Sequence, residues 1–181
     1  MNDFIPLLEE EIPRLRRYAC ALTRDIYRAD DLVQNCLERA VAKKHLWQPD
    51  TDLRAWLFTI LHNQHVNDIR RSVREGLSLP LEEMADRLPV EPRAYAKLEL
   101  RDLRAAIAKL AEEQRQVVLL VGLEGLRYDQ VADILGVPVG TVRSRLSRAR
   151  EQLRRLMGAE EMPSAKTSPE PTLAVSQPSA A

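Results

Sequence analysis

The strongest chemical signal in the sequence is a run of arginines near its C-terminal end. Between Thr141 and Met157 there are six arginines, no lysine and a single acid, Glu151. Arginine carries a permanent positive charge on a planar fork, which can hold phosphate oxygens or pair with guanine edges in the DNA major groove. A run of charge is often only a solvated surface. Here the predicted outward face of the segment lacks acids, which favours DNA contact. It carries Thr141, Ser144, Arg145, Ser147 and Arg148, with Arg143 and Arg150 at its flanks.

A second set of candidate residues mixes planar, amide and cationic side chains between residues 56 and 71. Planar rings can stack on exposed bases, amides can bond base edges, and cations can hold the phosphates of a single strand. His62 and His65 are spaced as a helical pair, but no third ligand accompanies them, so we predict no metal site. The set comprises Trp56, Phe58, His62, Asn63, His65, Asn67, Arg70 and Arg71.

A third candidate group is acidic. Asp31, Gln34 and Glu38 are spaced so that they share one face of a helix, opposite its apolar face. Such a stripe can be simple solvated surface, or it can dock on a basic helix of a partner.

The elements that must position these groups are predicted to be helices. The segment from Tyr128 to Leu135, with the small residue Ala132, is followed by Gly136 and by a longer basic helix that begins near Pro138. A short helix, a glycine turn and a second helix form the helix-turn-helix arrangement. Upstream, we expect a second-block helix from about residue 98 and, in a first block, helices over about residues 13–23, 29–46 and 53–73, the last of them capped by Asp52.

The spacing of these blocks divides the chain into two small helical domains. Residues 75–93 carry one glycine and three prolines around a few leucines, which indicates a linker with a short helical turn. Residues 159–181 are rich in Pro, Ser and Ala and contain no aromatic residue, so we expect a disordered tail. The predicted fold is therefore all-α, with a first domain over 1–74, a linker over 75–97, a helix-turn-helix domain over 98–158 and the tail over 159–181.

Composition excludes several classes of protein. The 27 basic and 27 acidic residues cancel, which excludes a uniformly basic nucleic-acid coat, yet residues 100–158 hold 11 basic and 7 acidic residues. No apolar run approaches the ~20 residues of a membrane span, and the N-terminus has no signal-peptide pattern, so we expect a cytoplasmic protein. Cys20 and Cys36 lie among apolar neighbours without metal spacing and are expected to be free, buried thiols.

With these motifs in order, the chain resembles the extracytoplasmic-function (ECF) group of bacterial RNA polymerase sigma factors over about residues 5–157. Three segments carry the resemblance: Ala29-Asp-Asp-Leu-Val-Gln34, then Leu53-Arg-Ala-Trp-Leu-Phe-Thr-Ile60 with Asn63, Asp68, Arg70 and Arg71, and finally Glu112-Glu-Gln-Arg115 through Tyr128 with Gly140-Thr-Val-Arg-Ser-Arg145. The helix-turn-helix alone would fit many regulators. Three motifs in the right order are specific.

The resemblance implies a role for each group. Asp31, Gln34 and Glu38 would face core RNA polymerase, and Trp47, Asn63, Arg70 and Arg71 would read and open the minus-ten element. The minus-thirty-five duplex would be met by Tyr128, Thr141, Arg143, Ser144, Arg145, Ser147 and Arg148. The resemblance also implies an anti-sigma factor as a regulatory partner, and no cofactor, metal or catalytic activity.

Two other classes of function remain open from the residues. A stand-alone helix-turn-helix regulator would account for residues 127–157, but not for the acidic stripe or the pattern from Trp56 to Arg71. An enzyme acting on nucleic acid is less favoured, because no paired carboxylates, phosphate-binding glycine loop or nucleophile–base set is present.

Overall fold

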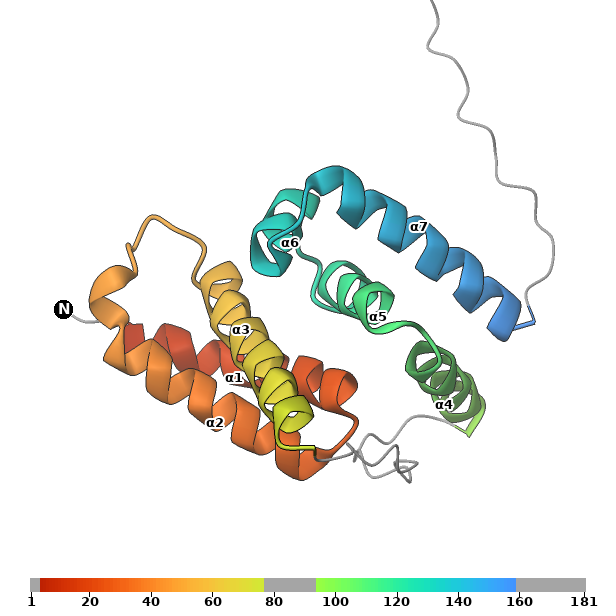
Figure 1. The fold of residues 1–181 in the computed structure, drawn as a ribbon, viewed down its shortest axis with the longest axis horizontal. Coiled ribbons are helices and arrows are strands. Elements are labelled where there is room, and N and C mark those ends of the chain that lie inside the picture. Colours follow the sequence, from red (N-terminus) through yellow and green to blue (C-terminus); the bar gives the residue numbers. More distant parts are fainter. Residues whose placement is uncertain (1–3, 77–93, 159–181) are drawn as a thin grey trace, which may run out of the picture.

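The computed structural model describes residues 4–76 and 94–158, which form seven α-helices and two short turns of helix (Figure 1). We call residues 4–76 the N-terminal half and residues 94–158 the C-terminal half. The N-terminal half contains α1 (Phe4–Thr23), α2 (Ile26–Ala42), the 3-10 turn η1 (Lys44–Leu46) and α3 (Leu53–Arg74). The C-terminal half contains α4 (Ala94–Ala108), α5 (Glu112–Val118), the π-helical turn η2 (Leu119–Leu123), α6 (Tyr128–Leu135) and α7 (Val139–Leu156).

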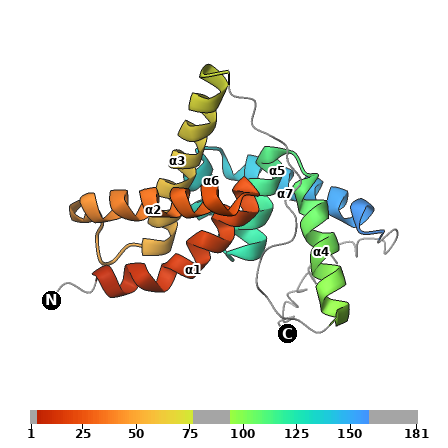
Figure 2. The same ribbon diagram turned by 90° about the horizontal axis from the view of Figure 1, so that it is seen from below.

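The two halves pack directly on one another. Helix α3 lies against α6, and α1 lies against η2, so the two halves share one continuous set of buried side chains (Figures 1 and 2). Helix α6 is therefore held between α3 on one side and α7 on the other. The sequence contained no sign of this contact between halves.

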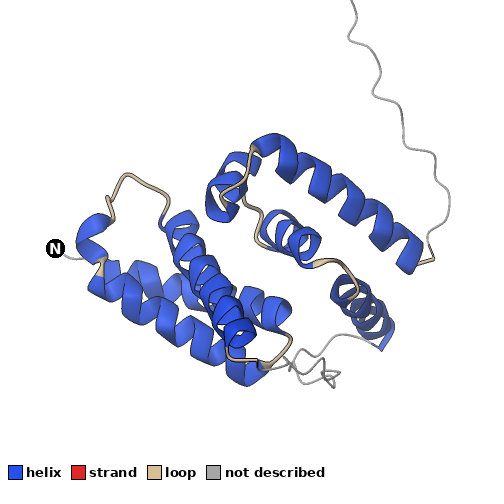
Figure 3. Cartoon of the chain, viewed as in Figure 1, coloured by secondary structure: helices blue, strands red, loops and turns tan. Residues whose placement is uncertain are grey.

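The predicted all-α fold is confirmed, because every regular element of the described residues is helical (Figure 3). Within these residues, no helix is both long and apolar enough to cross a membrane. The short helical turn expected within residues 75–93 and the expected tail over 159–181 lie outside the described residues, except at Glu75 and Gly76.

The first helix is longer than the sequence predicted. It was expected to begin at Pro13, but α1 begins at Phe4 and carries Pro13 in its interior. Proline removes one helical hydrogen bond. Burial of Phe4 and Leu8 compensates for this loss, since both side chains are about 95% or more buried and Phe4 lies against two tryptophan rings.

Side-chain caps set the starts of the other two helices in this half. Asp25 accepts hydrogen bonds from the backbone N–H groups of Tyr27 and Arg28, at 2.8 and 3.1 Å, so α2 begins three residues earlier than expected. Helix α2 also ends at Ala42, and η1 covers the rest of the segment predicted to be helical. The predicted cap of α3 is confirmed, because Asp52 accepts from the N–H of Ala55 at 3.1 Å.

The helix-turn-helix in the C-terminal half forms where the sequence placed it. Gly136 ends α6 with φ at 63°, a left-handed conformation that side chains with a Cβ resist. Helix α7 follows at once, and Val142, Leu146 and Ala149 form its buried seam. Ala132 of α6 is also buried, as a close helix crossing requires.

An apolar stripe that runs from Leu100 to Leu110 is only partly buried. Leu110 is in the core and Ile107 is half-buried, but Leu100 and Leu103 of α4 are 39% and 36% exposed. These two leucines line a groove of about 850 Å³, together with Ala106 and the end of α7.

Candidate nucleic-acid interface

The outward face of α7 carries positive charge that nothing in the described residues neutralises. Arg143, Arg145, Arg148 and Arg150 form no ion pair with any residue of 4–76 or 94–158. All of them are exposed except Arg145, which is half-buried. By contrast, Arg155 near the end of the same helix is paired with Glu151. The first three turns of α7 therefore offer unpaired guanidinium groups to an external anion.

The short polar residues of α7 lie between these arginines. Ser147 is exposed, and Ser144 is exposed with its hydroxyl donating to the carbonyl of Thr141 at 3.0 Å. Tyr128 and Thr141 stand at the beginnings of α6 and α7 and are half-buried. All seven predicted minus-thirty-five residues thus lie within the helix-turn-helix.

Helix α3 differs from α7 because polar residues in its middle are covered. His62, Gln64 and His65 are buried, whereas Asn63 between them is exposed. The Nε2 atom of His65 lies 3.4 Å from Oε1 of Glu112, which belongs to the C-terminal half. The packing of the two halves therefore involves the helix predicted to read the minus-ten element.

Burial and neighbouring charge also shift two pKa values here. Burial, assisted by the charge of His65, lowers the pKa of His62 to about 4, so this imidazole is neutral at pH 7. Burial alone would raise the pKa of Glu112, but hydrogen bonds and charge from His65 and Arg115 outweigh it and lower the pKa to about 2. No group of three metal-ligating side chains occurs in the part of the chain that the structure describes.

The other predicted minus-ten residues lie at the two ends of α3. Arg70 and Arg71 are exposed near its C-terminal end, and Arg71 donates to Glu75 at 2.9 Å. At the other end, before α3 begins, Trp47 is half-buried against Phe4, with ring centroids 5.5 Å apart. The indole N–H of Trp47 is buried and has no partner among the described residues.

The acidic stripe of α2 is exposed along its whole length. Asp31, Gln34 and Glu38 all face outward, and Gln34 donates to Glu38 at 3.1 Å. Tyr27 at the start of the same helix is 80% exposed. The opposite face of α2 is buried against α1 and α3.

These three groups of residues do not converge on one pocket. Helices α2 and α7 lie on opposite sides of the molecule, with α3 between them (Figure 1). Separate exposed surfaces on one chain suit large partners better than a small substrate.

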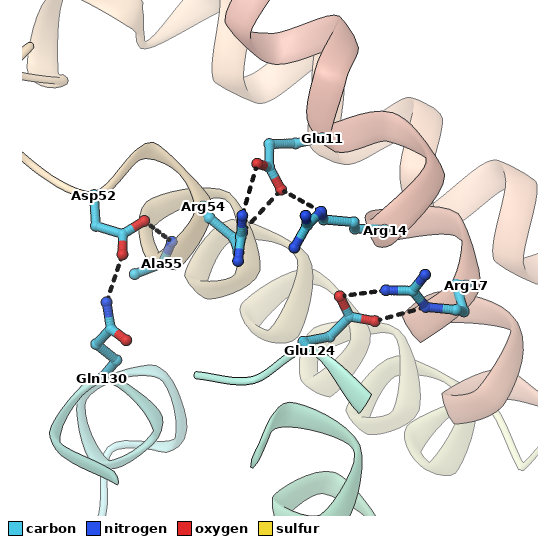
Figure 4. Close-up of polar contacts among 8 residues, drawn as sticks. All are labelled: Glu11, Arg14, Arg17, Asp52, Arg54, Ala55, Glu124 and Gln130. Carbon is cyan, nitrogen blue, oxygen red and sulfur yellow. Dashed lines mark hydrogen bonds and ion pairs between the residues drawn. The ribbon is translucent and has the colours of Figure 1, made fainter. Parts of the chain in front are cut away.

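The structure also forms polar pairs between the two halves that the sequence did not predict. Arg17 of α1 binds Glu124, which precedes α6, through two hydrogen bonds of 3.1 and 3.0 Å (Figure 4). Gln130 of α6 donates to Asp52 at 2.6 Å. These partners are 107 and 78 residues apart along the chain, so no local sequence signal could have identified the pairs.

Two family models match the chain, one in each half. Residues 8–62 match the model described as the sigma2 domain of PhyR, and residues 100–153 match the model of sigma-70 region 4. The first range covers most of α1, all of α2 and η1, and the beginning of α3. The second range begins within α4 and includes α6 and most of α7.

Whole-chain relatives agree with these matches. The chain is 42% identical to the ECF RNA polymerase sigma factor EcfG of Rhodopseudomonas palustris, over 83% of this chain and 84% of that protein. It is 31% identical to the ECF sigma factor SigC of Mycobacterium tuberculosis, over 84% and 80%. Among solved structures, the sigma factor RpoE of Bartonella quintana, in complex with the anti-sigma factor NepR, matches with a TM-score of 0.76 and 34% identity, over 89% of this chain and all of that one. The chain therefore belongs to the ECF group of the sigma-70 family, whose members bind core RNA polymerase and direct promoter recognition and transcription initiation.

Proposed function

We propose that this sigma factor divides its work among three surfaces. The α2 stripe docks on core polymerase, α3 with the loop before it captures the minus-ten element, and α7 holds the minus-thirty-five duplex. The observation that carries the proposal is the row of arginines on α7 that have no acidic partner within residues 4–76 and 94–158, in a chain whose total charge is zero.

The α7 surface suits duplex DNA. A recognition helix places its first turns in the major groove, and Arg143 and Arg148 are exposed in that part of α7. Arginine forks can bond guanine edges there, and we assign contacts with phosphates to Thr141, Arg145 and Tyr128. Because much of this contact is charge on phosphate, we expect the grip on DNA to weaken steeply with salt.

The α3 surface suits a strand that has left the duplex. Capture of an unstacked base offsets an unpairing cost of a few kcal/mol. Asn63 is exposed and can bond a base edge, and Arg70 and Arg71 can hold the strand's phosphates. Trp47 lies in the loop that would border the pocket for the flipped base.

The α2 surface gives a direct test of polymerase docking. Asp31→Arg reverses one charge of the stripe and should lower affinity for core polymerase about a hundredfold, measured by fluorescence anisotropy with labelled chain. Glu10→Arg, a reversal at an exposed position of α1, is the control and should bind as the wild type does. Equal affinity of the Asp31 variant and the wild type would remove the stripe from the interface.

The function as a whole is tested by reconstitution. Core polymerase without another specificity subunit should transcribe from some members of a panel of candidate promoters only when this chain is added. Silence on every template would contradict the proposal. Tight promoter binding by the chain alone in a gel shift would favour the rival, a stand-alone helix-turn-helix regulator.

We further propose that the chain acts in the cytoplasm, uses no cofactor and itself catalyses no reaction. The proposed domains are 1–74 for polymerase docking and the minus-ten element and 98–158 for the minus-thirty-five element, joined by the linker 75–97 and followed by the tail 159–181. The Bartonella relative is in complex with an anti-sigma factor, which supports a protein of that kind as a regulatory partner here.

A further inference from the structure

The C-terminal end of α2 and the turn η1 carry three cations that belong to none of the three surfaces described above. Arg39 lies in the last turn of α2, and Lys43 and Lys44 follow that helix. All three side chains are exposed, and none forms an ion pair with any residue of 4–76 or 94–158. We call these three residues the basic patch.

Backbone hydrogen bonds fix the position of the basic patch. The N–H of Lys43 donates to the carbonyl of Arg39 at 2.9 Å, so these two residues lie one helical turn apart on the same side. The N–H of Leu46 then donates to the carbonyl of Lys43 at 2.9 Å. The N–H of Trp47 donates to the carbonyl of Lys44 at 3.2 Å and completes the turn. The three cations are therefore held on ordered backbone.

Helix α2 changes the sign of its charge along its length. The acidic stripe that we assign to polymerase ends at Glu38, and Arg39 and the two lysines follow directly. The stripe is suited to a basic partner surface, whereas the basic patch is suited to an anion. The two ends of α2 thus present different chemistry, and the patch needs a partner of its own.

An apolar surface lies next to the basic patch. Leu46 is 61% exposed, and Trp47 after it is half-buried against Phe4, with ring centroids 5.5 Å apart. A single exposed leucine is common on protein surfaces. Beside unpaired cations, however, such a side chain can pack against a base or sugar while the cations hold the phosphates of a single strand.

The place of the basic patch in the fold indicates which anion it meets. The turn η1 leads directly into the loop before α3, where we propose that Trp47 borders the pocket for a flipped base. This segment between α2 and α3 stands at the opposite end of the molecule from α4 (Figures 1 and 2). A strand that places one base in this loop must carry its neighbouring phosphates past the turn, because consecutive phosphates are joined through a single nucleotide.

We propose that the basic patch binds phosphates of the melted strand beside the flipped base, with Leu46 packing against the strand. This inference rests on the proposed function, since it assumes that α3 and the loop before it capture the minus-ten element. The path of the strand then extends from α3 onto the end of α2. The patch also supplies free positive charge next to α3, whose Arg54 and Arg71 are already bound to acids.

A purely structural role for these cations makes a different prediction. Cations at the C-terminal end of a helix stabilise the helix dipole. Loss of that interaction alone would lower the melting temperature of the free chain and would leave DNA binding unchanged. The test therefore measures both quantities.

Holoenzyme assembled from core polymerase and the full chain is titrated with a labelled single strand that carries the minus-ten element of a promoter active in the reconstituted assay. Removing both lysines, in Lys43→Ala/Lys44→Ala, should weaken this binding about tenfold. The slope of log affinity against log salt concentration should decrease by about 1.4, since each lost phosphate contact contributes about 0.7 on a single strand. Lys109→Ala removes an exposed lysine of the C-terminal half and is the matched control.

Two further variants separate charge from apolar contact. Lys44→Arg keeps the charge and should bind the strand as the wild type does. Leu46→Ser removes apolar surface without changing any charge, and it should weaken binding about threefold at an unchanged salt slope. Because Leu46 is mostly exposed, this substitution should not lower the melting temperature of the free chain.

Circular dichroism melts verify that each variant folds, and Lys44→Ala alone replaces the double variant if that one does not. Wild-type strand affinity and salt slope in the lysine variant would overturn the proposal, whether or not its melting temperature falls. Weaker binding of core polymerase with unchanged strand binding would assign the patch to the polymerase interface and would also overturn it. Failure of the wild-type holoenzyme to retain the strand would instead contradict the proposed function of α3.

Discussion

Helices α3 and α7 are both long and both assigned to DNA, but they are presented differently. Helix α7 has 18 residues, and its arginines at 143, 145, 148 and 150 lack acidic partners among the described residues. Helix α3 has 22 residues, and its Arg54 and Arg71 are bound to Glu11 and Glu75. The middle of α3 is also buried, at His62 and His65.

The difference indicates two ways of meeting DNA. The charge of α7 is available in this arrangement of the two halves and can attract a duplex at a distance. The polar middle of α3 contacts the other half instead, so less of α3 is open to an external strand. Each prediction below tests one side of this contrast.

The largest effect is expected on transcription, when arginines of α7 are replaced. Replacing both Arg143 and Arg148 by Ala should reduce promoter-dependent transcription roughly a thousandfold, since each arginine contact contributes about 1–3 kcal/mol. Affinity for core polymerase should not change. Arg155→Ala on the same helix is the control, because this arginine is already paired with Glu151. A parallel loss of polymerase binding would show that α7 is not a DNA-specific surface.

A smaller effect is expected on the stability of the fold when the pH is lowered, because of His62 in α3. The pKa of His62 is about 4 in the folded chain and about 6.5 when unfolded, so the unfolded state binds more protons between these values. The free energy of unfolding should therefore be highest above pH 6.5 and fall by about 3 kcal/mol as the pH decreases to 4. The low pKa of Glu112 adds a further loss in the same direction below about pH 4.5.

Urea unfolding followed by circular dichroism at several pH values measures this loss. His62→Gln should flatten the slope between pH 6.5 and 4, whereas His45→Gln, at an exposed position of η1, should leave it unchanged. An unchanged slope in His62→Gln would mean that this histidine is not held neutral by burial.

The smallest effect is expected from Asn63, which is exposed between the buried side chains of His62 and Gln64. Asn63→Ala should slow promoter opening about tenfold, the loss expected for one or two hydrogen bonds to a base edge. Binding of the closed duplex should be unaffected. Glu10→Ala, at an exposed position of α1 outside the candidate residues, is the control. Permanganate footprinting of the melted strand measures the opening, and equal footprints in both variants would remove Asn63 from base contact.

Local signals in the sequence predicted much of the fold. The bounds of α6, its glycine end and the Asp52 cap of α3 were all predicted, because each depends on residues within one helical turn. The start of α1 was wrong, since Phe4 is held in the helix by Trp47 and Trp56 from distant segments. Long-range packing can outweigh a local helix breaker, and one sequence does not show it.

The sequence likewise predicted the exposure of some candidate site residues and not the burial of others. Exposure of Asp31, Gln34 and Glu38 followed from helical periodicity, and so did the open arginine face of α7. Burial of His62 and His65 did not, because it depends on contact with Glu112 and its neighbours in the other half. Leu100 and Leu103 show the converse, since these two apolar side chains of α4 are partly exposed.

The double use of Asp52 and Gln130 has a mechanical consequence. Each side chain binds its own helix start with one atom and the other half with another, so both caps remain in place when the two halves part. A separation of the two halves would therefore require neither α3 nor α6 to fray or refold at its start. Such a rigid-body motion would fall on the microsecond-to-millisecond timescale of hinged domains.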